Sequence, residues 1–159
     1  SPLVSKITPE PFLIANHLYG PSYISLDSAL FHWGLIPERV FEISCVTPKI
    51  SKKFMVQNAV YSYTHLPIAY YPVGIQSISL TKTQTVLIAS PEKALCDKVI
   101  TTAGINLRSK QQAMAFLVED LRLEEDQLRE LNTTEIISWL SVCPKRKSIQ
   151  LLIETLSAI

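Results

Sequence analysis

Glycine is scarce in this chain: its 159 residues include only four, at positions 20, 34, 74 and 104. Phosphate-binding loops and dinucleotide-binding fingerprints need glycines close together, because the backbone must approach the phosphates. Glycines this far apart exclude both motifs. The G-x-S-x-G turn that presents a nucleophilic serine in many hydrolases is also missing.

Metal-ligand patterns are absent as well. The three histidines, His17, His32 and His65, are too widely spaced for an H-x-x-x-H pair on a helix. No Asp or Glu is followed two positions later by Lys, the pattern with which many metal-dependent nucleases place an acid and a lysine beside one metal. We therefore predict no metal, no cofactor and no catalytic residue, and expect that the protein is not an enzyme.

Cysteine, net charge and apolar runs point to a cytoplasmic protein. Cys45, Cys96 and Cys143 are odd in number and form no C-x-x-C motif, which favours buried thiols in a reducing compartment. No apolar run approaches the roughly 20 residues of a membrane span, and no secretory signal opens the chain. The net charge of +1 is too small for a protein that binds nucleic acid over a broad face.

The best-marked local structure is a short helix over residues 26–33. Ser25 is expected to cap it, with its hydroxyl accepting a hydrogen bond from a free amide of the first turn. Gly34 is expected to end it in the left-handed conformation. An apolar face is predicted from the spacing of Leu26, Ala29, Leu30 and Trp33.

The flanking segments predict an α+β fold, with one domain over 1–159 divided into a helix pair (1–38), a sheet (40–89) and helices (90–159). A first helix is expected over Pro9 to Leu18. Short gaps between strands favour a mostly antiparallel sheet of four to five strands. The predicted strands are rich in β-branched and aromatic residues and lie at 40–46, 53–57, 59–66, 75–80 and 84–89. Ser90 and Pro91 are good N-cap and first-turn residues, which predicts a helix over 91–103.

Two segments carry a family resemblance. The strings PSYISLDSALFHWGLIPE at 21–38 and SPEKALCD at 90–97 resemble, in order and spacing, the C-terminal domain of the AbiEi family of abortive-infection antitoxins. Asp27 and Cys96 are conservative departures from the family pattern. The resemblance implies a type IV antitoxin that counteracts a nucleotidyltransferase-like toxin without necessarily forming a stable complex with it.

Members of this family usually bind operator DNA through an N-terminal winged helix. Only eight residues precede the first predicted helix here, so we expect no winged helix in this chain. We also expect that the domain alone does not bind operator DNA specifically. The alternative function is a nucleic-acid-processing enzyme whose site forms no recognisable motif.

Polar residues within the two family-like segments are the candidate interaction surface, since core packing accounts for the apolar ones. The spacing of Lys93 and Asp97 predicts an exposed ion pair one helical turn apart. Two basic clusters, Lys49/Lys52/Lys53 and 145–147, would gain significance only if folding brought them together. The candidate surface consists of Asp27, His32, Glu38, Glu92, Lys93 and Asp97.

Overall fold

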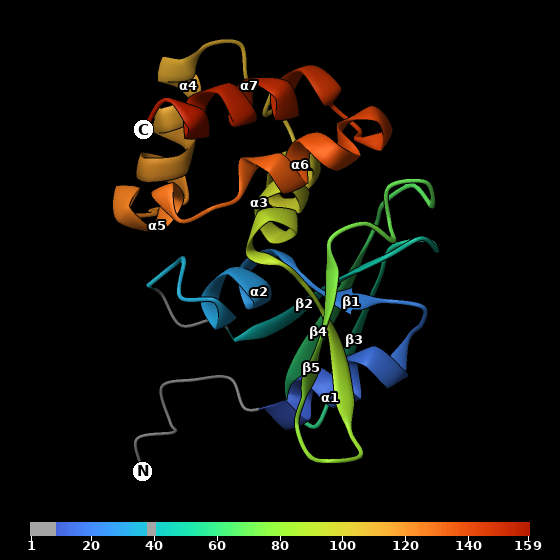
Figure 1. Cartoon of the computed structure of the whole chain (residues 1–159). Helices are drawn as coiled ribbons and strands as arrows, with labels where there is room; N and C mark the ends of the chain where they lie inside the picture. Colours follow the sequence, from blue (N-terminus) through green and yellow to red (C-terminus); the bar gives the residue numbers. More distant parts are fainter. Residues whose placement is uncertain (1–8, 38–40) are drawn as a thin grey trace.

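A six-stranded sheet and a group of C-terminal helices make up the fold, which is α+β as predicted (Figure 1). The computed structural model describes residues 9–37 and 41–159. In Figure 1 the sheet lies in the lower part of the molecule and α4 to α7 gather above α3. The strands are β1 (Tyr23–Ile24), β2 (Glu42–Thr47), β3 (Lys52–Val56), β4 (Ala59–His65), β5 (Ile75–Ser79) and β6 (Thr85–Ala89).

The sheet has six strands and is mixed, with more antiparallel than parallel pairs, so it roughly matches the predicted mostly antiparallel sheet of four to five strands. Its strand order is β3-β4-β2-β1-β6-β5. Three neighbouring pairs are antiparallel (β1/β2, β3/β4, β5/β6), whereas β2/β4 and β1/β6 are parallel. The five predicted strands all exist close to their expected positions. The sequence did not predict the two parallel pairs. Strand β4 lies between β3 and β2, so it is antiparallel to its hairpin partner β3 and parallel to β2.

The sequence prediction missed β1. This strand has only two residues, Tyr23 and Ile24, both fully buried at the centre of the sheet. It pairs antiparallel with β2 and parallel with β6, so it joins the two halves of the sheet. A two-residue strand is too short for alternation to be read from the sequence, and only its neighbours define it.

Helix α2 (Leu26–His32) has the predicted position and Ser25 is its N-cap residue, but the hydroxyl that accepts from the first turn belongs to another serine. The Ser25 hydroxyl makes no cap hydrogen bond. Instead, Ser44 on β2 accepts from the amide of Ser28 (3.1 Å), while its own amide donates to the Ser28 hydroxyl (2.9 Å). The cap therefore comes from a neighbouring strand, which ties the start of α2 to the sheet.

The C-terminal end of α2 is as predicted. Gly34 has φ +78°, and its amide donates to the carbonyl of Phe31 at 3.0 Å. The amide of Leu35 donates to the carbonyl of Leu30 at 2.8 Å. These two bonds form a Schellman motif, which ends the helix and turns the chain back toward the core.

Helix α3 (Pro91–Thr101) packs beside α2. Leu30, Leu95 and Val99 are fully buried. Trp33 is half-buried, and its indole N–H donates to the carbonyl of Ala89 at 2.8 Å. The two helices contact each other, and α2 also packs on β2 and α3 on β6.

The remaining helices cover the sheet from one side or form the separate C-terminal layer. Helix α1 packs on β1, β2 and β6, and the hydroxyl of Tyr63 donates to the carbonyl of Ala15 within it. Helix α4 continues directly into the π-helical segment η2. The elements are α1 (Pro9–Leu18), α4 (Lys110–Met114), η2 (Ala115–Asp120), α5 (Glu125–Arg129), α6 (Thr133–Trp139), the 3₁₀ turn η3 (Leu140–Val142) and α7 (Arg146–Ser157).

Replacing Gly34 tests the left-handed helix end. We expect Gly34→Val to lower the free energy of unfolding by more than about 1 kcal/mol, because a β-branched residue is strained at positive φ. A Cβ at this position would meet nothing within 4 Å, so backbone strain is the sole expected cause. Gly34→Asn is the control, since asparagine tolerates this conformation. Equal denaturant midpoints for wild type and the Val variant would contradict the interpretation.

Candidate functional site

Lys93 and Asp97 do not form the exposed ion pair that their spacing predicted. Both side chains have 0% exposure and lie between α3 and the sheet. The i, i+4 spacing predicted that the two side chains are neighbours on the helix. It did not predict whether that face of α3 points to solvent or to the core. They therefore cannot belong to a contact surface in the folded protein.

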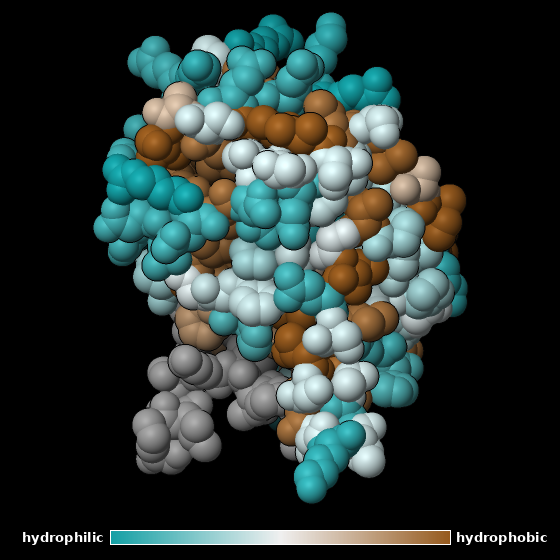
Figure 2. All heavy atoms as spheres, in the orientation of Figure 1, coloured by the Kyte–Doolittle hydropathy of each residue, from teal (hydrophilic) through white to brown (hydrophobic). Residues whose placement is uncertain are grey.

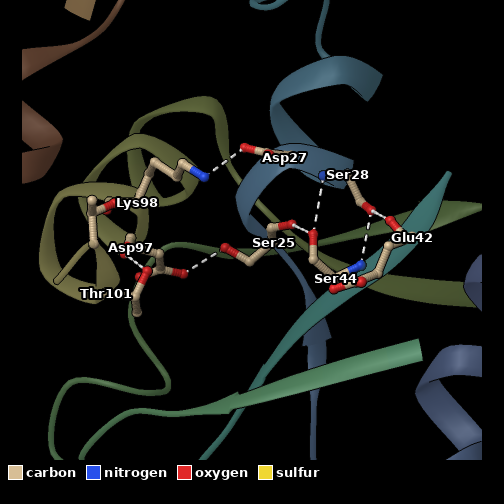
Figure 3. Close-up of polar contacts among 9 residues, drawn as sticks. Ser25, Asp27, Ser28, Glu42, Ser44, Asp97, Lys98 and Thr101 are labelled. Atoms are coloured by element: carbon tan, nitrogen blue, oxygen red, sulfur yellow. Dashed lines mark hydrogen bonds and ion pairs between the residues drawn. The ribbon is translucent and has the colours of Figure 1, made fainter. Parts of the chain in front are cut away.

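Three hydroxyl groups converge on the carboxylate of Asp97. Ser25 donates to Oδ2 at 2.6 Å (Figure 3), and Tyr23 from β1 donates to the same oxygen at 2.7 Å. Tyr70 donates to Oδ1 at 2.7 Å. Two of these donors come from the first family-like segment and the acceptor comes from the second. The two segments thus form one buried polar unit, and the loop before β5 contributes a third segment to it.

Lys93 holds that loop from the other side. Its ammonium donates to the carbonyls of Tyr70 (3.0 Å) and Tyr71 (3.1 Å) and also to that of Val73. It lies 4.1 Å from the centre of the Tyr70 ring, a cation–π distance. Gly74 follows with φ +70°, and a Cβ there would come within 2.8 Å of the Lys93 Cβ. The close approach of loop and lysine therefore depends on glycine at this position.

Burial shifts the titration of this cluster. It lowers the pKa of Lys93 to about 8, and the nearby carboxylate of Asp97 opposes that shift. Burial also raises the pKa of Asp97, against Lys93 and the three hydroxyl donors. The phenol pKa values of Tyr23 and Tyr70 are raised by burial and by the charge of Asp97. Removal from water is thus the largest influence on the pKa of each of these groups, and the hydrogen bonds offset part of the cost of burying them.

Glu92 is also structural. It is almost fully buried, and its Oε2 accepts from the amide of Asn132 at 2.9 Å. Asn132 is the N-cap of α6, so Glu92 fastens α3 to the C-terminal helices. All three polar residues of the SPEKALCD segment that were candidates for a surface, Glu92, Lys93 and Asp97, therefore stabilise the fold instead.

An open pocket lies where α2 and α3 approach the β2–β4 side of the sheet. It has a volume of about 560 Å³. Asp27 on α2 pairs with Lys98 on α3 at 3.0 Å (Figure 3), and Glu42 on β2 pairs with Lys53 on β3 at 3.7 Å. We call this the two-pair pocket. It is lined by Leu26, Asp27, Ile36, Phe41, Glu42, Ser44, Lys53, Ser62, Thr64 and Lys98.

Backbone strain and open hydroxyls mark the two-pair pocket. Leu26 has φ +54°, an uncommon conformation for a residue with a side chain. Such strain persists only where the surrounding structure imposes it, and it is concentrated at functional sites. No hydrogen bond within the described part of the chain uses the side-chain hydroxyls of Ser62 and Thr64. The pocket can therefore offer polar groups to a binding partner.

The other sequence candidates are dispersed. His32 is exposed at the end of α2, beside the rings of Phe12 and Trp33. Glu38 lies outside the described residues. The two basic clusters are not one patch: Lys49 belongs to the β2–β3 connection and contacts the Tyr19 ring, whereas Lys145 donates to carbonyls at the C-terminal end of α3.

The comparisons with known proteins identify no family. A scan of protein-family models found no match to the sequence, and a search of curated proteins found no significant match. Among residues 9–37 and 41–159, no group of three or more His, Cys, Asp or Glu side chains is arranged to hold a metal ion. No helix in these ranges is long and apolar enough to cross a membrane.

Removing the Lys93 ammonium should be severely destabilising. We expect Lys93→Met to lower the free energy of unfolding by about 3–5 kcal/mol, because it leaves the buried charge of Asp97 uncompensated and three loop carbonyls without their donor. Lys98→Met on the same helix is the matched control, and it should cost less than about 1 kcal/mol because its ion pair is partly exposed. Equal losses in urea denaturation would contradict the structural role of Lys93.

The lowered pKa of Lys93 also predicts a pH dependence. Between about pH 8 and the ordinary lysine pKa, the unfolded chain holds more protons than the folded protein, so Lys93 makes stability rise with pH in this window. The reference is the Lys93→Met/Asp97→Asn variant, which retains burial, the largest cause of the raised pKa values of Tyr23, Tyr70 and Cys96. The free energy of unfolding of this variant minus that of the wild type should become more negative by about 1–2 kcal/mol between pH 7.5 and 9.5. A constant difference would mean that Lys93 titrates normally.

Proposed function

We propose that this protein is a cytoplasmic, non-enzymatic antitoxin domain that protects cells from a nucleotidyltransferase-like toxin. The observation that carries the proposal is the joining of the two family-like segments. Tyr23 and Ser25 of the first segment donate to Asp97 of the second at 2.7 and 2.6 Å. Their side chains thus form one buried structural unit. This is expected if the chain shares the fold of the family domain that the two segments resemble.

In this proposal, the two-pair pocket is the surface through which the domain protects the cell from the toxin. Asp27 is the member of the candidate surface that lines it, with a side chain 46% exposed. The strained backbone of Leu26 and the hydroxyls of Ser62 and Thr64 lie at the same place. These groups can bind a partner, and they include no nucleophile paired with a general base, which supports a binding role over a catalytic one.

Co-expression with the nucleotidyltransferase-like toxin that this proposal pairs with the protein tests the function. Wild-type protein should restore growth of a bacterial host that expresses the toxin. Asp27→Asn/Lys98→Gln should lower the number of surviving colonies at least tenfold, because it removes the charged pair from the two-pair pocket. The soluble level and melting temperature of each variant should be measured alongside.

The matched control is Asp126→Asn/Arg129→Gln on α5. This pair also joins an acidic first-turn residue to a basic residue, and it lies in the C-terminal layer, away from the two-pair pocket. Its loss should leave rescue unchanged. Failure of soluble wild-type protein to rescue growth would contradict the proposed function, and full rescue by the Asp27/Lys98 variant would exclude this pair from it.

A further inference from the structure

The turn between β2 and β3, residues 48–51, is held in place by side chains of other segments. The hydroxyl of Tyr19 donates to the carbonyl of Ile50 at 3.0 Å. The ring nitrogen Nδ1 of His65 lies 3.1 Å from the carbonyl oxygens of both Pro48 and Lys49. Because a carbonyl oxygen only accepts, Nδ1 carries the proton in these contacts. Three successive carbonyls are thus occupied, and the turn offers hydrogen-bond donors rather than acceptors to a ligand.

Two lysine side chains converge on the ring of Tyr19. The Nζ atom of Lys49 lies 4.6 Å from the ring centre, and that of Lys52 lies 5.5 Å from it. Lys49 also donates to the carbonyl of Gly20 at 3.0 Å, and Lys52 lies 5.8 Å from the centre of the Phe54 ring. These contacts position the ammonium groups without neutralising them, because neither a ring nor a carbonyl carries a net charge.

The two ammonium groups have no carboxylate partner. None of the ion pairs among residues 9–37 and 41–159 includes Lys49 or Lys52. Two like charges beside one ring repel each other, and an anion bound between them removes that repulsion. The exposed side chain of His65 lies beside them, and its Nε2 atom adds a third positive charge when it binds a proton. The turn is therefore a local site for an anion in a chain whose net charge is only +1.

Exposed apolar side chains flank these cations. The amide of Leu66 donates to the carbonyl of Thr47 at 2.9 Å, so the loop after β4 runs beside the turn, at the right of Figure 1. Ile50 in the turn is 73% exposed, and Ile68 in that loop is 67% exposed. In the same orientation, Figure 2 shows apolar groups at the surface along the right-hand edge of the molecule, next to hydrophilic ones. A ligand at this place therefore meets cations and apolar groups together.

The hydrogen-bonding character of the turn favours a polynucleotide over a polypeptide. A polypeptide brings an N–H donor with almost every residue, and the turn has its carbonyls occupied. A phosphodiester backbone brings only acceptor oxygens and one negative charge per nucleotide, which matches two free ammonium groups. The unstacked bases of a single strand also pack against apolar and aromatic side chains, for which Ile50 and the half-buried Tyr19 are available.

An anionic membrane and a nucleic-acid duplex are poorer matches. Electrostatic recognition of anionic lipids usually uses clusters of about four to eight lysines or arginines. Here Lys49 and Lys52 are free, whereas the neighbouring Lys53 already faces Glu42 at 3.7 Å. In a duplex the base faces are stacked on one another, so they are not available to Ile50.

From these observations we infer that this protein binds a single-stranded polynucleotide at the surface formed by Lys49, Ile50, Lys52 and His65, which we call the turn surface. Phosphates lie against the two ammonium groups, and a base lies against Ile50. With two lysines and one histidine, the footprint covers only a few nucleotides. The inference goes beyond the proposed function, because it requires no contact with the toxin and does not depend on growth rescue.

Fluorescence anisotropy with the whole chain tests the turn surface. The probe is a fluorescein-labelled oligouridylate of about 12 nucleotides, which is unpaired in solution. Wild type should bind it at about 50 mM salt, with an affinity that falls as the salt concentration rises. Lys49→Gln/Lys52→Gln should weaken binding at least fivefold and reduce the slope of log K against log salt by about 1.4, since each phosphate contact on a single strand contributes about 0.7.

The matched control is Lys110→Gln/Lys147→Gln, which removes the same charge from exposed positions in the C-terminal layer. It should change the affinity less than twofold. The melting temperatures of both double variants should stay close to that of the wild type, because all four lysines are exposed. Ile50→Ser should weaken binding at least twofold without changing the salt slope, which distinguishes contact with a base from contact with phosphates.

The inference is overturned if the wild type fails to bind the oligouridylate, or if the two double variants lose affinity equally, which would show unspecific attraction. Equal affinity for a uridylate–adenylate duplex of the same length would mean a site for phosphates alone. Binding to phosphatidylserine vesicles in place of the oligouridylate would assign the turn surface to a membrane. None of these results alters the growth-rescue experiment, so the proposed function is judged separately.

Discussion

The fold depends on an ammonium group and a carboxylate that are both removed from water. Separating either from its partners would leave a buried charge, which costs several kcal/mol. Lys93 meets this constraint by donating to three carbonyls of one loop, and Asp97 meets it by accepting from hydroxyls of a strand, a helix start and that same loop. The positions of β1, α2 and the loop before β5 are therefore fixed relative to α3. A small displacement of any of them would leave a charged group unsatisfied.

This arrangement explains why polar residues in the most recognisable segments are poor candidates for a contact surface. In SPEKALCD, Glu92 holds the start of α6, while Lys93 and Asp97 hold the loop and the sheet. Their side chains are needed for the fold whatever the domain binds. The two-pair pocket differs, because its ion pairs are partly exposed and the hydroxyls of Ser62 and Thr64 make no hydrogen bond to any described residue. Mutations that report on binding should therefore be made at Asp27 and Lys98 rather than in the buried cluster.

The serine residues connect the buried cluster to the pocket. Ser25 donates to Asp97 and its carbonyl accepts from the hydroxyl of Ser44 at 2.7 Å, while Ser44 caps α2 through Ser28 (Figure 3). Leu26 lies between these fixed points, which accounts for its left-handed backbone: the hydrogen bonds on both sides impose a conformation that the residue would not otherwise adopt. The shape of the pocket at α2 is thus set by the same polar groups that hold the core.

Local signals in the sequence determined where most helices and strands lie. The bounds of α1, the end of α2 at Gly34 and the start of α3 at Ser90 follow from caps, prolines and apolar spacing, which act between residues a few positions apart. Only the tertiary structure decided the parallel pairing of β2 with β4, the insertion of β1 and the use of the Ser44 hydroxyl, in place of that of Ser25, as the acceptor at the start of α2. It also decided that Lys93 and Asp97 are buried. Each of these features is a contact between residues distant in the sequence, and the choice among such contacts depends on how the whole chain excludes water and satisfies its buried polar groups.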